Sequence, residues 1–369
     1  MLTKLLTRPT LLLDKKRCLQ NIERMAQKAA SQGLVLRPHF KTAQSKKVGN
    51  WFRDFGVRTI TVSSIRMAEY FAEDGWNDIT IAFPHNLHET DRLISLAEQT
   101  QINIVAENIE SLQPLTKRLK HPIQVMIKAD CGYHRTGLSI QEKNQIDRLI
   151  EFIEQHPPLS FRGFLTHSGH SYKVRGKQEI AKIHHESITE FAKFRAEYEQ
   201  AHPKLWLSYG DTPTCSAMDH FDGVNELRPG NFVFYDLSQW HIGSCNLDQI
   251  AVAMACPVVA KHPQRREVII YGGGVHFSKD RVKTLENMEY YGLVVEADAD
   301  SWQVDANAPK VVSLSQEHGT VKGSVDWLEK VKIGDWLYIL PVHSCMTADL
   351  MKEYLTTEGE WIRDVLRLE

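Results

Sequence analysis

Short apolar runs alternate with longer charged stretches between residues 34 and 230. Each run has the length of a strand and is followed by enough chain for a helix. The intervening stretches, such as residues 64–75, carry apolar residues at helical spacing. The runs are LVLRPHF (34–40), TITVSS (59–64), ITIAF (79–83), INIVAE (102–107), IQVMIKAD (123–130), SFRGFLTH (160–167), LWLSYG (205–210) and NELRPG (225–230).

Strands that alternate with helices predict right-handed βαβ units and a parallel sheet. Eight units fit a closed (β/α)₈ TIM-like barrel better than an open doubly wound sheet, and no GxGxxG follows a strand. After about residue 250 the runs read as strands joined by turns and charged loops, without intervening helices. We therefore predict an α/β barrel over residues 15–249 and a mostly antiparallel β domain over residues 250–369. Residues 1–14 can join either domain.

Composition narrows the class of protein. The chain has 369 residues, with 44 Lys and Arg against 46 Asp and Glu, so its formal net charge is −2. This balance argues against an electrostatic nucleic-acid binder, and 42% hydrophobic residues are too many for a disordered chain. The longest apolar stretch, residues 250–260, contains a proline and is too short to span a bilayer.

The N-terminal residues and the cysteines predict a cytoplasmic location. Residues 1–14 are interrupted by Lys4, Arg8 and Pro9, so they lack the continuous apolar core of a signal peptide. The six cysteines are scattered and form no CxxC pair, so we expect reduced thiols.

Lys41 is the first candidate for chemistry, because the C-terminal ends of barrel strands form the open mouth. Its amine can point into that mouth, desolvated and close to Arg37 or Arg135, and both effects favour the neutral amine that forms an imine. The alternative interpretation is that Lys41 is a solvated lysine at the end of a strand. Residues 210–214 and 228–231 offer backbone N–H groups and hydroxyls suited to a phosphate, although each loop alone can be a simple turn. A lysine and a phosphate cradle on one rim together point to pyridoxal phosphate.

Two further motifs suggest a metal ion and a ring contact. His343 and Cys345 stand two apart in WLYILPVHSC, so both side chains would leave one face of a strand. Imidazole and thiolate suit Zn²⁺, and two ligands leave positions open for a catalytic role. The alternative is a buried cysteine beside a hydrogen-bonded histidine. His167, at the mouth, either contacts a planar ring or supports its loop.

Seven motifs carry a resemblance to a known family, in that family's order over residues 9 to about 350. They are RPHFKT, HRTG, THSGHSY, YGDTPT, ELRPGNFVFYD, SQEHG and VHSC. With them the chain resembles the fold-type III pyridoxal-phosphate enzymes, and among these the D-threonine aldolase and D-serine dehydratase branch of alanine-racemase-like proteins. The resemblance implies a barrel of the alanine racemase N-terminal type followed by a β domain.

The resemblance also implies roles for individual residues. Lys41 would form the imine with the cofactor and act as the catalytic residue. His343 and Cys345 would hold Zn²⁺, or another divalent ion such as Mn²⁺ or Mg²⁺, beside the β-hydroxyl of a D-amino acid. The cofactor would be contacted through its phosphate by Thr212, Gly230 and Asn231, near its ring by Tyr172 and His167, and at its pyridine nitrogen by Arg135.

One position departs from the branch. A histidine commonly stands two residues after the imine lysine, and this chain has Ala43 there. Fine substrate specificity is therefore not carried over from the family, whereas the imine is.

The resemblance implies a lyase with two open outcomes. The thiolate ligand is similar to that of the zinc-dependent dehydratases, whereas aldolases carry a carboxylate at that position. We therefore favour dehydration to ammonia and a keto acid over retro-aldol cleavage to glycine and an aldehyde. A racemase is a further alternative, although no second base can be assigned, and the β domain argues against a simple cofactor carrier. Because the fold usually completes its site from two subunits, we expect a homodimer.

Overall fold

The computed structural model describes residues 2–284, 287–297, 301–303, 305 and 307–367. The chain divides into two compact units. We call Glu23–Lys41 with Gly49–Gly230 the barrel unit, and Met1–Ile22, Thr42–Val48 and Asn231–Glu369 the β unit. None of the helices in the described residues is both long and apolar enough to cross a membrane.

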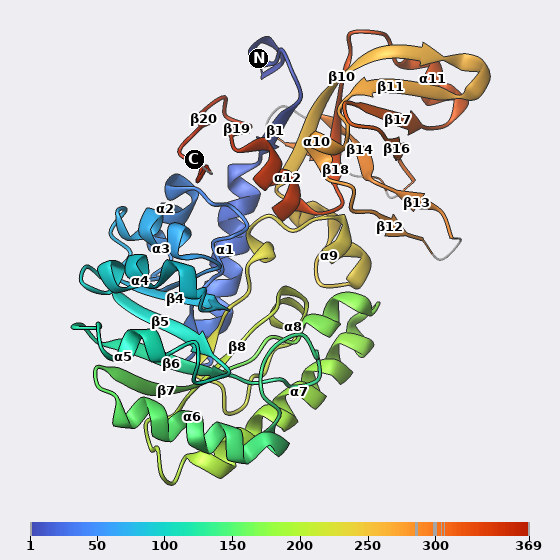
Figure 1. Ribbon diagram of the computed structural model, residues 1–369. Coiled ribbons are helices and arrows are strands. Elements are labelled where there is room, and N and C mark those ends of the chain that lie inside the picture. Colours follow the sequence, from blue (N-terminus) through green and yellow to red (C-terminus); the bar gives the residue numbers. More distant parts are fainter. Residues whose placement is uncertain (1, 285–286, 298–300, 304, 306, 368–369) are drawn as a thin grey trace. The chain divides into compact units, whose positions relative to one another are not determined.

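The barrel unit holds a parallel sheet of eight strands within the described residues, in the order β2-β9-β8-β7-β6-β5-β4-β3 (Figure 1). A parallel bridge between His39 and Thr61 joins the extension of β2 to β3 and closes the ring. Every apolar run of the sequence contributes one strand, so the predicted TIM-like barrel is confirmed. The strands are β2 (Val35–Leu36), β3 (Ile60–Val62), β4 (Asp78–Pro84), β5 (Gln101–Ala106), β6 (Ile123–Lys128), β7 (Leu159–Leu165), β8 (Trp206–Tyr209) and β9 (Glu226–Leu227).

The segments between the strands form helices because their apolar residues recur at helical spacing. In α6 the buried residues are Ile146, Leu149, Ile150 and Ile153, which form one stripe along the helix. The helices of the barrel unit are α3 (Ile65–Ala72), α4 (Thr90–Ala97), α5 (Gln113–Thr116), α6 (Lys143–Gln155), α7 (Lys177–Tyr198) and α8 (Thr212–Ala217), while α1 (Lys15–Ser31) and α2 (Lys46–Asp54) contribute residues to both units.

The β unit closes a second, antiparallel barrel. Its ring runs β10-β11-β17-β16-β14-β18 and returns to β10. Residues 10–13, which the sequence left unplaced, form β1 and pair with β10 and β19. The strands are β1 (Thr10–Leu13), β10 (Val252–His262), β11 (Glu267–Tyr271), β12 (Val282–Lys283), β13 (Glu289–Tyr290), β14 (Gly292–Ala297), β15 (Trp302–Gln303), β16 (Lys310–Leu314), β17 (His318–Lys322), β18 (Trp336–Pro341), β19 (Tyr354–Thr356) and β20 (Trp361–Ile362).

The expectation that no helix interrupts the strands after residue 250 is wrong. Local capping explains one of these helices, because the Ser324 side chain accepts a hydrogen bond from the Trp327 N–H at 3.2 Å and begins α11. The helices of the β unit are α9 (Leu237–Ile242), α10 (Gly274–Phe277), α11 (Val325–Lys330) and α12 (Ser344–Met351).

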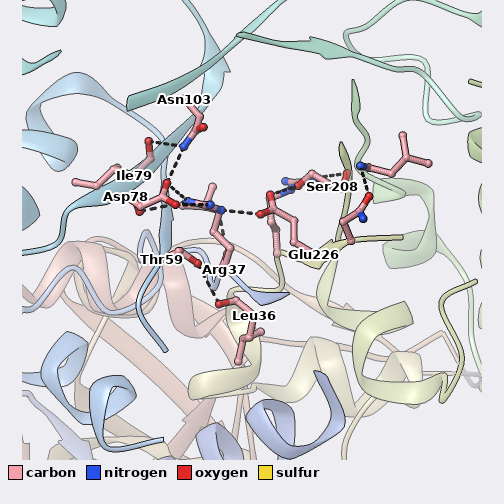
Figure 2. Close-up of polar contacts among 12 residues, drawn as sticks. Leu36, Arg37, Thr59, Asp78, Ile79, Asn103, Ser208 and Glu226 are labelled. Carbon is pink, nitrogen blue, oxygen red and sulfur yellow. Dashed lines mark hydrogen bonds and ion pairs between the residues drawn. The ribbon is translucent and has the colours of Figure 1, made fainter. Parts of the chain in front are cut away.

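A charged network lies buried in the barrel unit (Figure 2). The Arg37 side chain is 3% exposed and pairs with Asp78 at 2.7 Å and with Glu226 at 2.8 Å. Asn103 donates a hydrogen bond to Asp78 at 2.8 Å. Burial raises the pKa of the Glu226 carboxyl, but the Arg37 charge, together with hydrogen bonds from Ser208 and Arg37, outweighs it and lowers that pKa below its usual value. Glu226 is therefore ionised at neutral pH.

The same network reaches the C-terminal end of β9. The Ser208 hydroxyl donates to Glu226 and accepts from the Arg228 guanidinium, which also donates to the Thr166 carbonyl oxygen. Arg228 is thus held by Ser208 of β8 and by Thr166, which follows β7. The buried charges of the network determine where this arginine lies.

Replacement of Glu226 tests the network. Glu226→Gln should lower the free energy of unfolding by about 3 kcal/mol or more, because it leaves buried guanidinium charge without its partner. Urea unfolding followed by circular dichroism measures the change. The control, Arg118→Gln, breaks an exposed pair with Asp91 and should cost less than about 1 kcal/mol. Equal small losses in both variants would contradict a stabilising role for the network.

Candidate active site

Lys41 lies in the turn that follows β2. Its backbone N–H donates to Nδ1 of His39 at 3.4 Å. The neighbouring Phe40 packs into an aromatic cluster, with ring centroids 4.9 Å from Phe71 and 5.1 Å from Trp76. Lys41 itself is exposed.

The expectation of a desolvated Lys41 is therefore wrong, whereas its closeness to Arg37 or Arg135 stays a prediction. Phe40 anchors this turn through its own side chain, while the guanidinium of Arg37 is held by Asp78 and Glu226. The turn, and not the strand before it, sets the exposure of Lys41.

Lys128 is the buried lysine of the barrel unit that the sequence analysis did not single out. It ends β6 and is 9% exposed. Burial, followed by the positive charges of Arg228 and Arg135, lowers the pKa of Lys128 to about 7. The available signal was a charged residue at the end of an otherwise apolar strand, in IQVMIK.

The same positive charges lower the pKa values of two histidines, His39 and His167. Burial, then the charges of Lys41 and Arg228, lowers the pKa of His39 well below its ordinary value. Burial, then the charge of Lys128, has the same effect on His167. Both rings are neutral at pH 7, and the cations around them form an environment that favours an anionic ligand.

Three of the residues predicted to bind the cofactor lie together. The Tyr172 hydroxyl accepts a hydrogen bond from the Thr212 N–H at 3.2 Å. The Gly230 N–H donates to the Thr212 hydroxyl at 3.4 Å. Asp211 caps α8 by accepting from the Thr214 N–H at 2.8 Å and so places Thr212 at the first position of that helix. Backbone N–H groups and hydroxyls of this kind suit a phosphate.

His167 supports its loop. Its Nδ1 lies 2.6 Å from the Gly210 carbonyl oxygen, which can only accept, so Nδ1 carries the proton. The ring centroid lies 5.7 Å from that of Tyr133 and 6.3 Å from that of Tyr172. A Cβ at Gly169 would come within 2.5 Å of the Tyr133 ring, which explains why glycine occupies this position in the THSGHSY motif. Contact of His167 with a bound ring stays a prediction.

Arg135 and Arg228 differ in their surroundings. Arg135 is exposed, with its guanidinium 4.9 Å from the centroid of the Tyr133 ring. Arg228 is buried and hydrogen bonded to Ser208. The resemblance implies Arg135 as the contact to the cofactor ring, while the sequence places Arg228 in a candidate phosphate loop. The burial of Arg228 depends on partners far away in the sequence.

In the β unit, the strand expected to carry both His343 and Cys345 ends earlier. β18 ends at Pro341, His343 caps α12, and Cys345 lies in the first turn of that helix. The predicted strand geometry is therefore wrong. The physical reason is a long-range cap, because the Asp236 carboxylate accepts from the Ser344 N–H at 3.0 Å and favours a helix start there.

The two side chains nevertheless interact. Burial lowers the pKa of His343, but hydrogen bonds to Asp280 and Cys345 outweigh it and raise that pKa to about 11. Burial raises the pKa of Cys345, but hydrogen bonds with His343 and Thr42, together with the His343 charge, outweigh it and lower that pKa. Thr42 Oγ1 also lies 3.2 Å from the sulfur. A metal ion binds the thiolate and the neutral imidazole, so its binding to this pair would release protons.

Asn231 also belongs to this cluster. Its amide nitrogen lies 2.6 Å from an Asp236 carboxylate oxygen, 3.0 Å from the Ser344 hydroxyl and 3.4 Å from the Cys345 sulfur. Its contact with a phosphate, which the resemblance implies, stays a prediction.

The donor sets fit the two expected groups. The cations and neutral imidazoles of the barrel unit suit a phosphorylated cofactor, with Lys41 as an accessible amine. Imidazole and thiolate suit a divalent zinc-like ion. The described residues contain no group of three or more His, Cys, Asp or Glu that could hold a metal ion. The pair therefore leaves the remaining positions of an ion to water or substrate.

Comparisons with known proteins agree with this geometry. A model of the alanine racemase N-terminal domain matches residues 13–238, and a model of a serine dehydratase domain matches residues 251–357. The D-serine dehydratase of Dictyostelium discoideum is 30% identical over 367 residues, covering 90% of this chain and 89% of that protein. The D-threonine aldolase of an Arthrobacter species is 24% identical over 241 residues, covering 62% and 61%.

A solved structure extends the likeness to the whole fold. D-threo-3-hydroxyaspartate dehydratase from a Delftia species has a TM-score of 0.88 at 25% identity, covering 98% of each chain. Another solved structure, of a cysteine-to-alanine mutant of such a dehydratase, is described as metal-free and has a TM-score of 0.90 at 25% identity, covering 98% of this chain and 99% of that one.

Lys128 generates a prediction about stability and pH. Below pH 7 Lys128 is charged when folded and unfolded, so its burial opposes folding in full. Between pH 7 and about 10.4 the unfolded chain binds a proton that the folded chain does not, so stability rises with pH. Lys128→Met should therefore raise the melting temperature at pH 6, and the gain should shrink toward pH 10.

Calorimetry of the cofactor-free protein across this pH range provides the measurement. Lys182→Met, at an exposed position of α7, serves as the control and should show no such pH-dependent gain. A Lys128→Met variant that melts below the wild type at pH 6 would show that the lysine charge is stabilised in the folded protein.

Proposed function

The chain belongs to the alanine racemase N-terminal domain family, and from this premise we propose that it is a pyridoxal-phosphate- and metal-dependent lyase of D-β-hydroxy amino acids. Dehydration of D-serine or D-threonine to ammonia and a keto acid is the favoured reaction. The observation that carries the proposal is a cation-rich barrel mouth in a chain that also has an imidazole–thiolate pair.

Each group supplies one part of the chemistry. When bound, pyridoxal phosphate stabilises negative charge at the substrate Cα, and a divalent ion polarises the β-hydroxyl. Lys41 would hold the cofactor aldehyde through Nζ, and the same nitrogen would accept the Cα proton of the substrate. His343 and Cys345 would hold the ion. The β-hydroxyl of D-serine would leave with a proton as water, and a second water would hydrolyse the resulting 2-aminoacrylate to pyruvate and ammonia.

Residues of the barrel unit orient the cofactor in this proposal. Thr212 and Gly230 would bind the phosphate, with Tyr172 beside them; the proposal is supported by the hydrogen bonds that hold these three residues together. His167 stays neutral and presents Nε2, because Nδ1 donates to the Gly210 carbonyl oxygen. Arg135 is the residue proposed to face the pyridine nitrogen, and Asn231 completes the phosphate contacts.

The sequence links the two parts of the proposed chemistry. Lys41 is bonded to Thr42, whose hydroxyl lies 3.2 Å from the Cys345 sulfur. Gly230 is likewise bonded to Asn231, whose amide lies 3.4 Å from the same sulfur.

A thiolate ligand and the relatives favour dehydration over aldol cleavage. The Dictyostelium dehydratase matches 90% of this chain, whereas the Arthrobacter aldolase matches 62%. The metal-free cysteine mutant of the Delftia-type dehydratase supports a metal role for a cysteine in such enzymes. We assign Zn²⁺ as the ion because imidazole and thiolate match its preferences.

We also infer a cytoplasmic homodimer. All six cysteines are free thiols, which supports a reducing compartment. Exposed apolar side chains at 39–43% occur on or beside α10 and α12, two helices that contact each other, which supports burial of this surface in an interface. They are Tyr271, Val275, Met346 and Leu350.

Product analysis tests the proposal. The protein loaded with pyridoxal phosphate and Zn²⁺ should convert D-serine to equal amounts of pyruvate and ammonia, and D-threonine to 2-oxobutyrate and ammonia. His343→Ala should lose bound Zn²⁺ and lyase turnover together, by about 100-fold or more, because a metal Lewis acid contributes several kcal/mol. Metal analysis and a coupled keto-acid assay provide the measurements.

The control is His185→Ala, an exposed histidine of α7, which should keep both properties. Formation of glycine and acetaldehyde from D-threonine would show that the reaction is aldol cleavage and not dehydration. Racemised serine without any of these products, or a His343→Ala variant with full turnover, would overturn the metal-dependent lyase.

A further inference from the structure

Asp280 contacts one of the two proposed metal ligands from a distant part of the chain. Its Oδ2 lies 2.7 Å from Nδ1 of His343, across 63 residues of sequence. A carboxylate oxygen accepts hydrogen bonds, so the imidazole nitrogen is the donor in this contact. Nδ1 of His343 therefore carries a proton, and Nε2 is the ring nitrogen left for another partner.

The loop that carries Asp280 has a constrained backbone. Helix α10 ends at Ser278, which adopts a φ of 69°, a left-handed conformation that a residue with a Cβ rarely occupies. The Ser278 hydroxyl accepts a hydrogen bond from the Asp280 N–H at 3.1 Å. Strain of this kind persists only where surrounding contacts impose it, and here the tight turn fixes the backbone of Asp280.

A second contact holds this loop against the helix of the other ligand. The Thr347 hydroxyl, in α12, donates to the Phe277 carbonyl oxygen at 3.2 Å. Cys345 lies in the first turn of the same helix. Two hydrogen bonds therefore connect the segment 277–280 to the start of α12, one from Thr347 and one from His343.

We infer that Asp280 is a positioning residue of the metal site, an assignment that rests on the proposed metal role of His343 and Cys345. It selects the tautomer of His343 that presents Nε2 to the ion, fixes the ring orientation and increases its basicity. Histidine ligands are commonly oriented by a carboxylate in this way. Asp280 acts through His343 and is not itself a ligand, because its carboxylate contacts the opposite nitrogen of the ring.

Zinc affinity of the full-length, cofactor-loaded protein tests this role. Competition with a chromogenic chelator should show affinity about 10- to 100-fold weaker in Asp280→Ala. Asp280→Asn should lose less, because its amide oxygen still accepts from Nδ1 but without the charge. Binding of pyridoxal phosphate, followed by the absorbance of its link to lysine, should stay at the wild-type level in both variants.

Glu289→Gln is the matched control. Glu289 is an acidic residue of the same unit with a side chain 41% exposed, against 49% for Asp280, and it pairs with Arg281. It should bind Zn²⁺ like the wild type. The absorbance of Co²⁺-loaded protein adds a second readout, in which Asp280→Ala should shift the spectrum relative to the wild type and Glu289→Gln should not.

The outcomes separate two failures. A wild type that binds no Zn²⁺ would overturn the proposed metal role and this inference with it. Wild-type binding that Asp280→Ala and Asp280→Asn retain in full, with an unchanged Co²⁺ spectrum, would overturn only the role of Asp280. Equal losses in Glu289→Gln would show that the effect reflects general surface charge.

Discussion

Crowded positive charge in the barrel unit is the constraint on which the other features depend. The Arg228 guanidinium donates a hydrogen bond to Ser208, and the Ser208 hydroxyl donates one to Glu226. The nearby Arg37 charge helps to keep Glu226 ionised. The resulting potential contributes to the neutral state of His39 and His167 and lowers the pKa of Lys128 to about 7. A buried cation that lacks an anionic partner opposes folding. A phosphorylated cofactor would supply the missing negative charge and give the arrangement its purpose.

The two units divide the proposed work by the chemistry of their donors. The barrel unit provides amines, guanidinium groups and backbone N–H groups, all suited to an anion. The β unit provides an imidazole, a thiolate and a carboxylate that orients the imidazole. Neither set can perform a metal-assisted elimination alone, because one stabilises charge at Cα and the other acts on the β-hydroxyl.

The sequence predicted the barrel well because each strand lies in a short apolar run, and each of the eight runs became a strand. It predicted features set by distant partners poorly. The HxC strand was wrong because Asp236 caps a helix at Ser344, and the desolvation of Lys41 was wrong because Phe40 anchors the turn. Lys128 and Asp280 went unrecognised for the same reason: their significance lies in neighbours across the fold. The motifs located the candidate residues, while the contacts give their protonation states.

The most direct test asks which lysine the cofactor occupies, because Lys41 is exposed while Lys128 is the lysine whose pKa is lowered to about 7. The protein is loaded with pyridoxal phosphate, reduced with borohydride, digested and analysed by mass spectrometry. The account predicts that the reduced cofactor is attached to Lys41 and that Lys128 is unmodified. Attachment to Lys128, or recovery of an unlabelled protein, would contradict it.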